Sequence, residues 1–421
     1  MIDRLRDSLV EAGKFGRTSP ERIEKFDQLD SSKGVTRPVG TEENRKIRDY
    51  AVECMKEAGL KVKIDKVGNI FGIKEGSKTI KGTIMLGSHL DSVVNGGMFD
   101  GALGVFAAIE VIRRMNDDGF DNEKPVEIVV FTGEEGSAFS PTLLGSSVLV
   151  GKLSIDEALN RKNNQGQTLQ EALENIGYKG SFERSLDDVE YFIEMHIEQG
   201  PVLFNERESV GIVENISGVV WIIATISGQG NHAGTTPMGM RKDALVVASG
   251  VISFVNKRAK EMVERLGSST VGTVGKLEVF PNGINIVPER VEMGIDIRDV
   301  VQQHMESLKN ETLKTLGYIA GKYGVDIHTE LPISHLPVRL SDEVVEILGE
   351  SARQVGIITK RMNSGAVHDS LNMAMKVKVG MIFVPSISGI SHSPLEWTNW
   401  EDIEKGTQVL TQTVKNLSKF N

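Results

Sequence analysis

Four short apolar runs constrain the fold of this chain more than any other feature of its sequence. They are Thr83–Leu86, Val126–Thr132, Tyr191–His196 and Val377–Val384. Runs of this length and character are typical of buried strands. After the first run, apolar residues recur at helical spacing from Ala102 to Met115. Because strands and helices alternate along the chain, the sequence predicts an α/β fold with a largely parallel, mixed sheet flanked by helices.

A histidine and an aspartate flank the end of the first run. His89 lies in Gly-Ser-His-Leu-Asp-Ser at the strand end, and Asp100 comes just before the predicted helix. In open α/β sheets, ligands bind outside the carboxyl ends of the strands. An imidazole and a carboxylate delivered there suit Zn²⁺, Mn²⁺ or Co²⁺. The alternative is that His89 caps a strand and Asp100 caps a helix.

The other three strand ends favour the metal interpretation. The second run is followed by Glu134 and Glu135, the third ends in His196, and the fourth is followed by His392. Chance seldom places a potential ligand at all four strand ends. The sequence therefore predicts a metal site at this edge of the sheet.

This pattern of ligands resembles the M20 family of dinuclear metallohydrolases. The similarity runs nearly end to end, from Gly-Val-Thr-Arg at residues 34–37 to His392. Three segments, Gly-Ser-His-Leu-Asp-Ser, Glu-Glu-Gly-Ser-Ala-Phe and His-Ile-Glu-Gln-Gly-Pro, resemble the branch that hydrolyses ureido compounds. That branch contains N-carbamoyl-L-amino acid amidohydrolases, allantoate amidohydrolases and β-ureidopropionases.

The resemblance implies two divalent metal ions in each chain. One ion would take His89, Asp100 and His196, and the other would take Asp100, Glu135 and His392, so that Asp100 bridges the two. Three protein ligands leave an open position on each ion, as in catalytic sites. Zn, Mn, Co and Ni all accept such ligands.

Two further acidic residues near these ligands are expected to act without binding metal. Glu134 adjoins Glu135 on an irregular turn, so its side chain can face the attacking water and serve as general base. A solvated helix start is the alternative for this pair. Asp91, two residues after His89, is expected to accept the second N–H of that imidazole and fix its tautomer. Capping a loop is the alternative for Asp91.

The resemblance also assigns substrate contacts to Gln199, His232, Asn285, Arg298 and Gly365. Gln199 would lie beside the metals, and Gly365 would meet the ligand through its backbone. Arg298 is expected to hold a carboxylate with its planar fork, and His232 to stabilise the oxyanion as a catalytic residue. Without the resemblance, Arg298 would be interpreted as part of a surface ion pair, and a structural role would likewise be preferred for His232.

After Gly200 the pattern changes and predicts a second module. Strands and helices follow the order βαββαβ between Val219 and Leu331, which describes a two-layer α+β unit with both helices on one face. We expect a catalytic domain in two parts, residues 1–215 and 333–421. Residues 216–332 would form an inserted lid, and the resemblance implies that this lid also dimerises.

Other segments are assigned structural roles. Residues 140–189 are expected to be mostly helical, with a turn at 145–147. No Gly-x-Ser-x-Gly elbow occurs, which argues against a serine hydrolase. The pair His368-Asp369 is expected to cap a helix start. Thr36 and Arg37 lie on a loop that would either border the active site or be solvated.

Composition and charge exclude several classes of protein. The net charge of −10 disfavours non-specific binding of nucleic acid. The single cysteine, Cys54, permits neither an intrachain disulfide nor a thiolate cluster, and its place on an apolar helical face indicates a core residue. The start of the chain has no apolar signal core, and no run of 18 apolar residues could span a membrane. We therefore expect a cytoplasmic enzyme.

The leading functional hypothesis is an amidohydrolase acting on N-carbamoyl-L-amino acids, with release of ammonia and carbon dioxide. Allantoate amidohydrolase or β-ureidopropionase is the alternative, followed by an M20 dipeptidase. A set of Gln199, Asn285 and Arg298 suits a small carboxylated ureide better than a dipeptide. A metal-bearing scaffold without activity would be expected to lack Glu134 or a ligand. The expected partners are the small ureido substrate and a second copy of the chain.

Overall fold

The computed structural model describes residues 2–17, 21–80 and 82–419. The chain divides into two compact units, one formed by residues 1–214 and 339–421 and the other by residues 215–338. The second boundary lies later than the predicted one at residues 332/333. The reason is that β13 (Ser334–His335) pairs with β7 (Gly218–Ser227) and so keeps these residues with the second unit.

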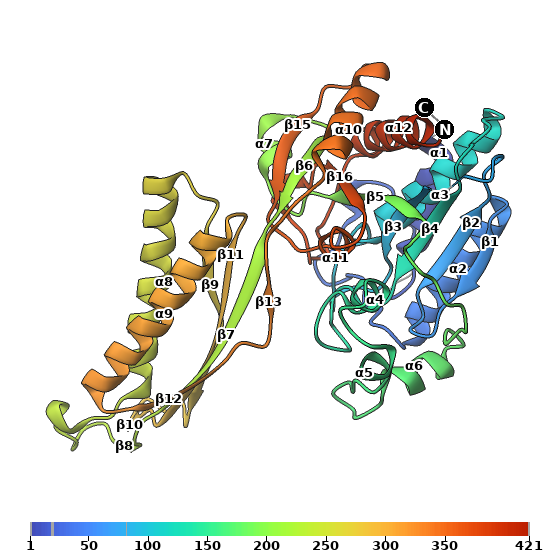
Figure 1. The fold of residues 1–421 in the computed structure, drawn as a ribbon. Coiled ribbons are helices and arrows are strands. Elements are labelled where there is room, and N and C mark those ends of the chain that lie inside the picture. Colours follow the sequence, from blue (N-terminus) through green and yellow to red (C-terminus); the bar gives the residue numbers. More distant parts are fainter. Residues whose placement is uncertain (1, 18–20, 81, 420–421) are drawn as a thin grey trace. The chain divides into compact units, whose positions relative to one another are not determined.

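The first unit is built on a nine-stranded mixed sheet (Figure 1). Its path is β1-β2-β4-β3-β5-β16-β6-β14, and β15 pairs with β6. In that order the strands are β1 (Lys61–Ile64), β2 (Ile70–Lys74), β4 (Val126–Phe131), β3 (Thr83–His89), β5 (Val189–Ile197), β16 (Lys378–Val384), β6 (Gly211–Ile216) and β14 (Val338–Arg339), with β15 at Lys360–Ser364.

The four predicted runs are the four central strands of this sheet. β4, β3, β5 and β16 run parallel to one another, and nearly all of their residues are buried. The predicted α/β fold with a largely parallel sheet is confirmed. Register places His89 opposite Phe131 and His196 opposite Phe383. The carboxyl ends of these strands therefore reach the same edge of the sheet.

Long amphipathic helices cover this sheet, with α3 and α12 packed directly on the parallel strands. The long helices are α1 (Ile2–Ala12), α2 (Glu42–Glu57), α3 (Ala102–Asp117), α10 (Asp342–Gln354) and α12 (Trp400–Leu417). The helix predicted after Asp100 is thus confirmed. Cys54 on α2 is buried, as predicted for a core residue, and burial raises the pKa of its thiol.

The expectation of mostly helical structure for residues 140–189 is wrong. Only three short helices form there, α4 (Leu144–Leu149), α5 (Ile155–Leu159) and α6 (Leu169–Asn175). Residues 145–147 lie within α4 and do not form the predicted turn. Ser154 and Thr168 each form a capping box at the start of a new short helix, so the segment contains separate short helices and no long one. Two more short helices, α7 (Val202–Glu206) and α11 (Asp369–Met373), follow β5 and precede β16.

The second unit has the predicted order of strands and helices. Its antiparallel sheet has the order β12-β7-β11-β9, with β12 at Asp326–Glu330, β11 at Arg290–Asp299 and β9 at Val271–Phe280. Two long helices, α8 (Ala244–Leu266) and α9 (Gln302–Tyr323), pack on the sheet with an apolar core between the layers. A separate small ladder joins β8 (Asn231–His232) to β10 (Ile286–Val287). The expected lid and dimerisation roles stay predictions.

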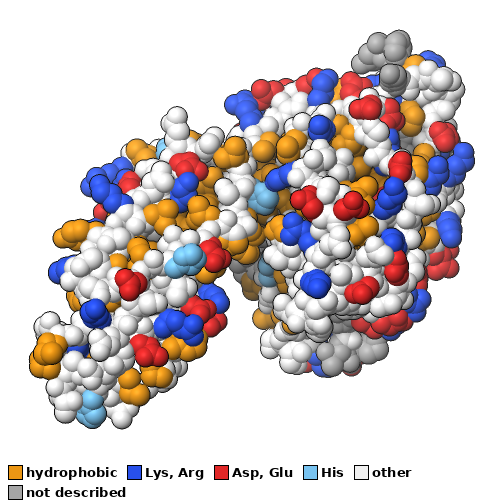
Figure 2. Space-filling view, turned by 60° about the horizontal axis from the view of Figure 1, so that its bottom comes forward, with side chains coloured by type: hydrophobic (Ala, Val, Ile, Leu, Met, Phe, Trp, Pro, Cys, Tyr) orange, Lys and Arg blue, Asp and Glu red, His pale blue; other side chains and the backbone are white. Residues whose placement is uncertain are grey.

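The face of the molecule drawn in Figure 2 carries charged side chains of both signs. On this face, acidic and basic side chains are interspersed among the described residues. They form no continuous basic area that could bind the phosphate backbone of a nucleic acid. Among the helices that the structure describes, none combines the length and the apolar character needed to cross a membrane.

Candidate active site

Six side chains of types that could hold a metal ion meet at the carboxyl ends of the four central strands. They are His89, Asp100, Glu134, Glu135, His196 and His392. Their ligand atoms form groups that lie within 4.8 Å of one another, and two of these groups are the two predicted ligand sets. The structure therefore brings together all the predicted ligands, although their binding of metal stays a prediction.

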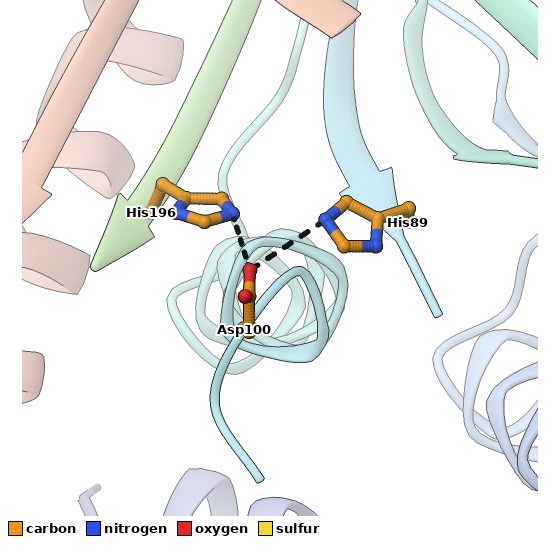
Figure 3. Close-up of side chains that lie close together, drawn as sticks. All are labelled: His89, Asp100 and His196. Carbon is orange, nitrogen blue, oxygen red and sulfur yellow. Dashed lines mark ion pairs between the residues drawn. The ribbon is translucent and has the colours of Figure 1, made fainter. Parts of the chain in front are cut away.

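The first set is buried around one oxygen of Asp100. Nε2 of His196 lies 3.2 Å and Nε2 of His89 lies 3.7 Å from Asp100 Oδ1. Figure 3 shows both rings directing these nitrogens at the carboxylate from neighbouring strands. All three side chains are almost fully buried.

The second set gathers around the other oxygen of the same carboxylate. Nε2 of His392 lies 3.2 Å from Asp100 Oδ2 and 3.5 Å from Glu135 Oε2. The His392 side chain is half exposed, so this set lies on the solvent side of the site. Asp100 thus offers one oxygen to each set, which is what a bridging carboxylate requires.

Backbone carbonyls fix the tautomers of the two buried imidazoles. Nδ1 of His89 lies 3.1 Å from the main-chain oxygen of Asp91, and Nδ1 of His196 lies 2.9 Å from that of Ile197. Each Nδ1–H can donate to its carbonyl, which leaves Nε2 as the ring nitrogen that faces Asp100. This arrangement is typical of histidines that bind metal.

The carboxylate of Asp91 does not contact His89 as predicted. Its Oδ1 is 3.9 Å from His89 Nδ1, beyond hydrogen-bond distance. Instead Oδ1 accepts hydrogen bonds from the backbone N–H groups of Gly133 and Glu134, at 3.2 and 3.3 Å, and Oδ2 accepts that of Glu135 at 3.2 Å. Asp91 therefore fixes the turn that carries both glutamates, and His89 takes its partner from the backbone of Asp91.

Buried negative charge dominates the electrostatics of the site. Burial and neighbouring carboxylates, among them Asp100, hold the pKa values of Glu134 and Glu135 well above their usual range. The pKa of His196 is raised to about 9, because the interactions with Asp100 outweigh the opposing effect of burial. Asp100 is also buried, but His196 and His392 keep its pKa well below normal.

These features fit a divalent cation. Oε1 of Glu135 is buried yet has no hydrogen-bond partner among residues 2–17, 21–80 and 82–419. Buried carboxylates that repel one another are stabilised by a positive charge placed between them. Three imidazoles with three carboxylates match the ligand preferences of Zn, Mn, Co or Ni.

Glycine at position 101 allows Asp100 to approach His89. Gly101 has φ of +65°, and a Cβ atom there would lie 2.4 Å from Cε1 of the His89 ring. Any other residue would therefore meet both backbone strain and a collision with a predicted ligand.

Arg37 does not lie in a solvated loop, one of the two alternatives given by the sequence, and its charge interacts with Asp91 and Asp100. It is fully buried, with Nε donating to the Leu90 carbonyl at 2.8 Å and Nη1 to that of Ala12 at 3.1 Å. Its backbone N–H donates to Ser92 Oγ at 3.0 Å. Burial lowers the pKa of Arg37 to about 10. Arg37 thus holds the segment after His89 in place through its hydrogen bonds to Leu90 and Ser92.

His368 occupies the N-cap position of α11 as predicted, but its side chain makes no capping hydrogen bond. The ring packs instead against His196, with centroids 4.5 Å apart, and its Nε2 lies 3.1 Å from Ser364 Oγ. The sequence therefore predicted the N-cap position of His368 but not the contact of its ring with His196, a predicted ligand.

The predicted substrate contacts of the first unit are Gln199, which is half-buried, and Gly365, which is exposed. Nε2 of Gln199 donates to Asp100 Oδ2 at 3.0 Å, which places this amide at the metal site. Gly365 is exposed, and a Cβ built on it would meet no atom within 4 Å. Open space beside this backbone is compatible with a ligand there.

The predicted contacts of the second unit fall into two separate places. His232 lies on the β8–β10 ladder and Asn285 directly precedes β10, where its carbonyl accepts the N–H of Ala233 at 2.9 Å. Arg298 lies at the other end of β11, where it forms a two-pronged ion pair with Asp296 at 2.9 and 3.0 Å.

Strand register gives the separation of these two places. Arg298 pairs with Val219, whereas Arg290 pairs with Ser227, the last residue of β7 before the His232 segment. Eight residues of extended strand span about 26 Å. Within one chain, therefore, the structure does not bring Arg298 and His232 together.

The sequence missed one buried acidic residue at the site, Glu396. Its carboxylate accepts hydrogen bonds from the backbone N–H groups of Phe99 and Asp100, both at 3.1 Å. A glutamate only four residues after His392 was the available signal, but it does not show which distant backbone groups it meets.

Comparison with known proteins places this site in a family. The model of the family described as Peptidase family M20/M25/M40 matches residues 85–416. An N-carbamoyl-L-amino acid amidohydrolase from Geobacillus stearothermophilus is 38% identical over 99% of this chain and 98% of its own length. An allantoate amidohydrolase from Bacillus subtilis is 34% identical over 91% of this chain and 93% of its own.

A solved structure agrees with these sequence comparisons. The crystal structure of an amidase of the hydantoinase/carbamoylase family from Burkholderia multivorans matches with a TM-score of 0.88 at 34% identity. The match covers 99% of this chain and 98% of that one. The resemblance predicted from the sequence motifs is confirmed.

Proposed function

The chain belongs to peptidase family M20/M25/M40, and on this premise we propose that it is a metal-dependent amidohydrolase of N-carbamoyl-L-amino acids. The observation that carries the proposal is the pair of ligand sets sharing Asp100, with Glu134 buried beside them. The substrate class is supported by full-length similarity to a protein named N-carbamoyl-L-amino acid amidohydrolase.

Two divalent cations would be held by His89, Asp100 and His196 and by Asp100, Glu135 and His392. Bound there, they would polarise the ureido carbonyl and lower the pKa of a water molecule. The chain's own contribution is to hold the donor atoms of these side chains in place and to accept and return protons during the reaction.

Glu134 is the proposed general base. Its Oε2 lies 3.6 Å from His89 Nε2, so the carboxylate borders the first ligand set. A buried carboxylate with raised proton affinity can take the proton of the attacking water and return it to the leaving nitrogen. Attack at the carbamoyl carbon expels ammonia and leaves an N-carboxylated amino acid, which loses carbon dioxide to give the free amino acid.

The remaining residues would bind and orient the substrate. Gln199 and Gly365 are proposed to contact it from the first unit. Arg298 is proposed to hold the carboxylate of the substrate, which would either replace Asp296 as the partner of the guanidinium or share it with Asp296. Nδ1 of His232 accepts the N–H groups of Gly234 and Thr235, at 2.9 and 3.2 Å. The neutral ring therefore carries its proton on Nε2, where it can donate to an oxyanion.

We further propose a homodimer in which His232 and Asn285 complete the site of the partner subunit. Eight residues of extended strand, about 26 Å, separate Arg298 from the end of β7 before the His232 segment. A small ureide cannot span that length, so one substrate cannot meet both residues from the same chain. The segments around His232 also expose large apolar side chains, those of Met238, Met240 and Ile284. Such exposed apolar surface is compatible with burial against another protein surface.

Allantoate is the second candidate substrate, because a relative at 34% identity carries the name allantoate amidohydrolase. Both candidates are carboxylated ureides and would use the same ligands. We favour the N-carbamoyl amino acid because the relative named N-carbamoyl-L-amino acid amidohydrolase is more similar, at 38% identity over 99% of the chain. β-Ureidopropionase and dipeptidase activities rank below these two.

The test is ammonia release by metal-reconstituted enzyme from N-carbamoyl-L-methionine, N-carbamoyl-β-alanine and allantoate. We expect the fastest release from N-carbamoyl-L-methionine and none after removal of metal with a chelator. Preference for allantoate would favour the second candidate. Hydrolysis of dipeptides without ammonia release from any ureide would contradict the proposal.

A further inference from the structure

One buried carboxylate joins the two loops that carry Asp100 and His392. Glu396 is 1% exposed. Its Oε1 accepts the backbone N–H groups of Phe99 and Asp100, both at 3.1 Å, and its Oε2 accepts the hydroxyl of Ser391 at 2.7 Å. These contacts reach the backbone of Asp100 itself and the residue just before His392.

The neighbouring loop is shaped to admit this side chain. A Cβ atom at Gly97 would lie 2.1 Å from Glu396 Oε1 and 2.5 Å from Glu396 Cβ. Gly97 is not one of the glycines with positive φ. Its lack of a side chain therefore serves the close approach of Glu396 and is not required by the backbone conformation.

The loop of His392 needs such support. His392 and Ser388 both have left-handed backbones, with φ of 51° and 57°, which non-glycine residues adopt only where surrounding structure holds them. The His392 side chain is half exposed and so contributes little packing. The hydrogen bond between Ser391 and Glu396 ties this strained loop to the interior.

The segment after Glu396 is itself firmly anchored. The ring of Phe99 packs edge-on against Trp397 and Trp400, with centroids 5.3 and 5.4 Å away. Trp397 is almost completely buried. Glu396 is therefore fixed on one side by this aromatic cluster, and its carboxylate can act as a rigid acceptor for both loops.

We propose that Glu396 is a positioning residue that sets the relative placement of Asp100 and His392 for binding a divalent cation, with Gly97 as its required partner. The inference rests on the metal-binding role proposed above for Asp100 and His392. Glu396 does for these two loops what Asp91 does for the turn of Glu134 and Glu135. Outer-shell partners of this kind typically change metal affinity by about 10–100-fold when lost.

The first test is a titration of the metal-free full-length chain with Zn²⁺ in competition with a chromogenic chelator. Glu396→Ala should weaken Zn²⁺ binding by about 10–100-fold. Glu396→Gln should retain most of the affinity, because its amide can still accept from Phe99 and Asp100 and can donate to Ser391. The matched control is Glu110→Gln, which alters a buried glutamate bound to Arg4 and Arg114 on α3. It should lower Tm but leave Zn²⁺ affinity unchanged.

A double-mutant cycle separates positioning from general destabilisation. Gly97→Ala should weaken Zn²⁺ binding in the unmodified chain, since its methyl group displaces Glu396. In a Glu396→Gly background the same change should cost little, because the three nearest atoms to that methyl group all belong to the Glu396 side chain. If Glu396→Ala does not fold, Gly97→Ala and Glu396→Gln decide the question.

The outcomes distinguish this inference from the proposed function. Tight Zn²⁺ binding by the unmodified chain, with Glu396→Ala within twofold of it, would overturn the role of Glu396 alone. Equal and additive losses from Gly97→Ala in both backgrounds would do the same. Failure of the unmodified chain to bind Zn²⁺ would overturn the metal site and this inference together.

Discussion

The two units of the chain present their predicted functional residues in opposite ways. In the first unit the ligands are mostly buried, and carbonyl groups, Asp91 and Glu396 fix their orientation. In the second unit His232 is exposed on a two-residue ladder, and Asn285 is exposed directly before β10. The first unit therefore carries a preorganised set of donors, whereas the exposed His232 and Asn285 would need another surface in order to act as proposed.

Strand geometry underlies this difference. The parallel strands of the first unit converge at one edge, so residues far apart in sequence meet there. The antiparallel ladder of β7 and β11 instead spreads Arg298 and the His232 segment toward opposite ends. A site in the first unit is built within one chain, while the two functional places of the second unit cannot serve one small substrate in the same chain.

Asp100→Ala should have the largest effect, because it removes the group shared by both ligand sets of the first unit. We expect loss of both ions and of measurable activity, with the fold retained as judged by circular dichroism. Elemental analysis of the purified variant measures the metal content. Full metal content in this variant would show that Asp100 is not the shared ligand.

Glu134→Gln should keep the metals and lower kcat by about 10²–10⁴-fold, the usual contribution of a general base. Elemental analysis and steady-state ammonia release measure the two quantities on the same sample. Turnover close to that of the unmodified enzyme would place the base elsewhere in the first unit.

His232→Ala tests the catalytic role proposed for the second unit. This exposed side chain belongs to the second unit, which contains none of the predicted ligands, so the variant should retain both metals. Loss of an oxyanion donor should lower kcat by about 10²–10³-fold. Reduced metal content, or unchanged kcat, would contradict the assignment of this residue to catalysis.

Mixing His232→Ala with Glu134→Gln chains tests whether the second unit acts on a partner. With random exchange, half of the dimers would be mixed, and each mixed dimer would hold one intact composite site. Activity should recover to about a quarter of the unmodified level. No recovery, with subunit exchange confirmed by mass spectrometry, would mean that His232 acts within its own chain or has no role.

Arg298→Ala should have the smallest effect of this series. Loss of a charge-assisted hydrogen bond to the substrate carboxylate costs about 1.5–3 kcal/mol. The expected result is an increase in KM of about 10–100-fold with metal content unchanged. An equal increase for an uncharged amide analogue of the substrate would show that Arg298 does not bind the carboxylate.

Much of the first unit could be predicted because its signals are local. Each buried parallel strand is a short apolar run, and the ligand follows it directly, as with His89 and His196. Strands β14 and β15, which flank β6, lack such a signal, because β14 is short, β15 is polar and both are defined by distant partners. The same reason explains the miss at Asp91, whose carboxylate meets backbone N–H groups more than 40 residues away.

The arrangement of the second unit could be predicted only in outline. The order of its strands and helices follows from alternation and helical periodicity, and it matches the structure. Register, which sets the distance between Arg298 and His232, depends on pairing across strands that no single segment reveals. The sequence therefore names these residues through family resemblance but cannot show that they lie at opposite ends.

The most direct test of the shared role of Asp100 is electron paramagnetic resonance of the full-length protein reconstituted with Mn²⁺. If Asp100 bridges two ions, they lie about 3.5–4 Å apart, and at two Mn²⁺ per chain the spectrum should show exchange coupling between them. An isolated six-line Mn²⁺ signal that saturates at one ion per chain would contradict the account.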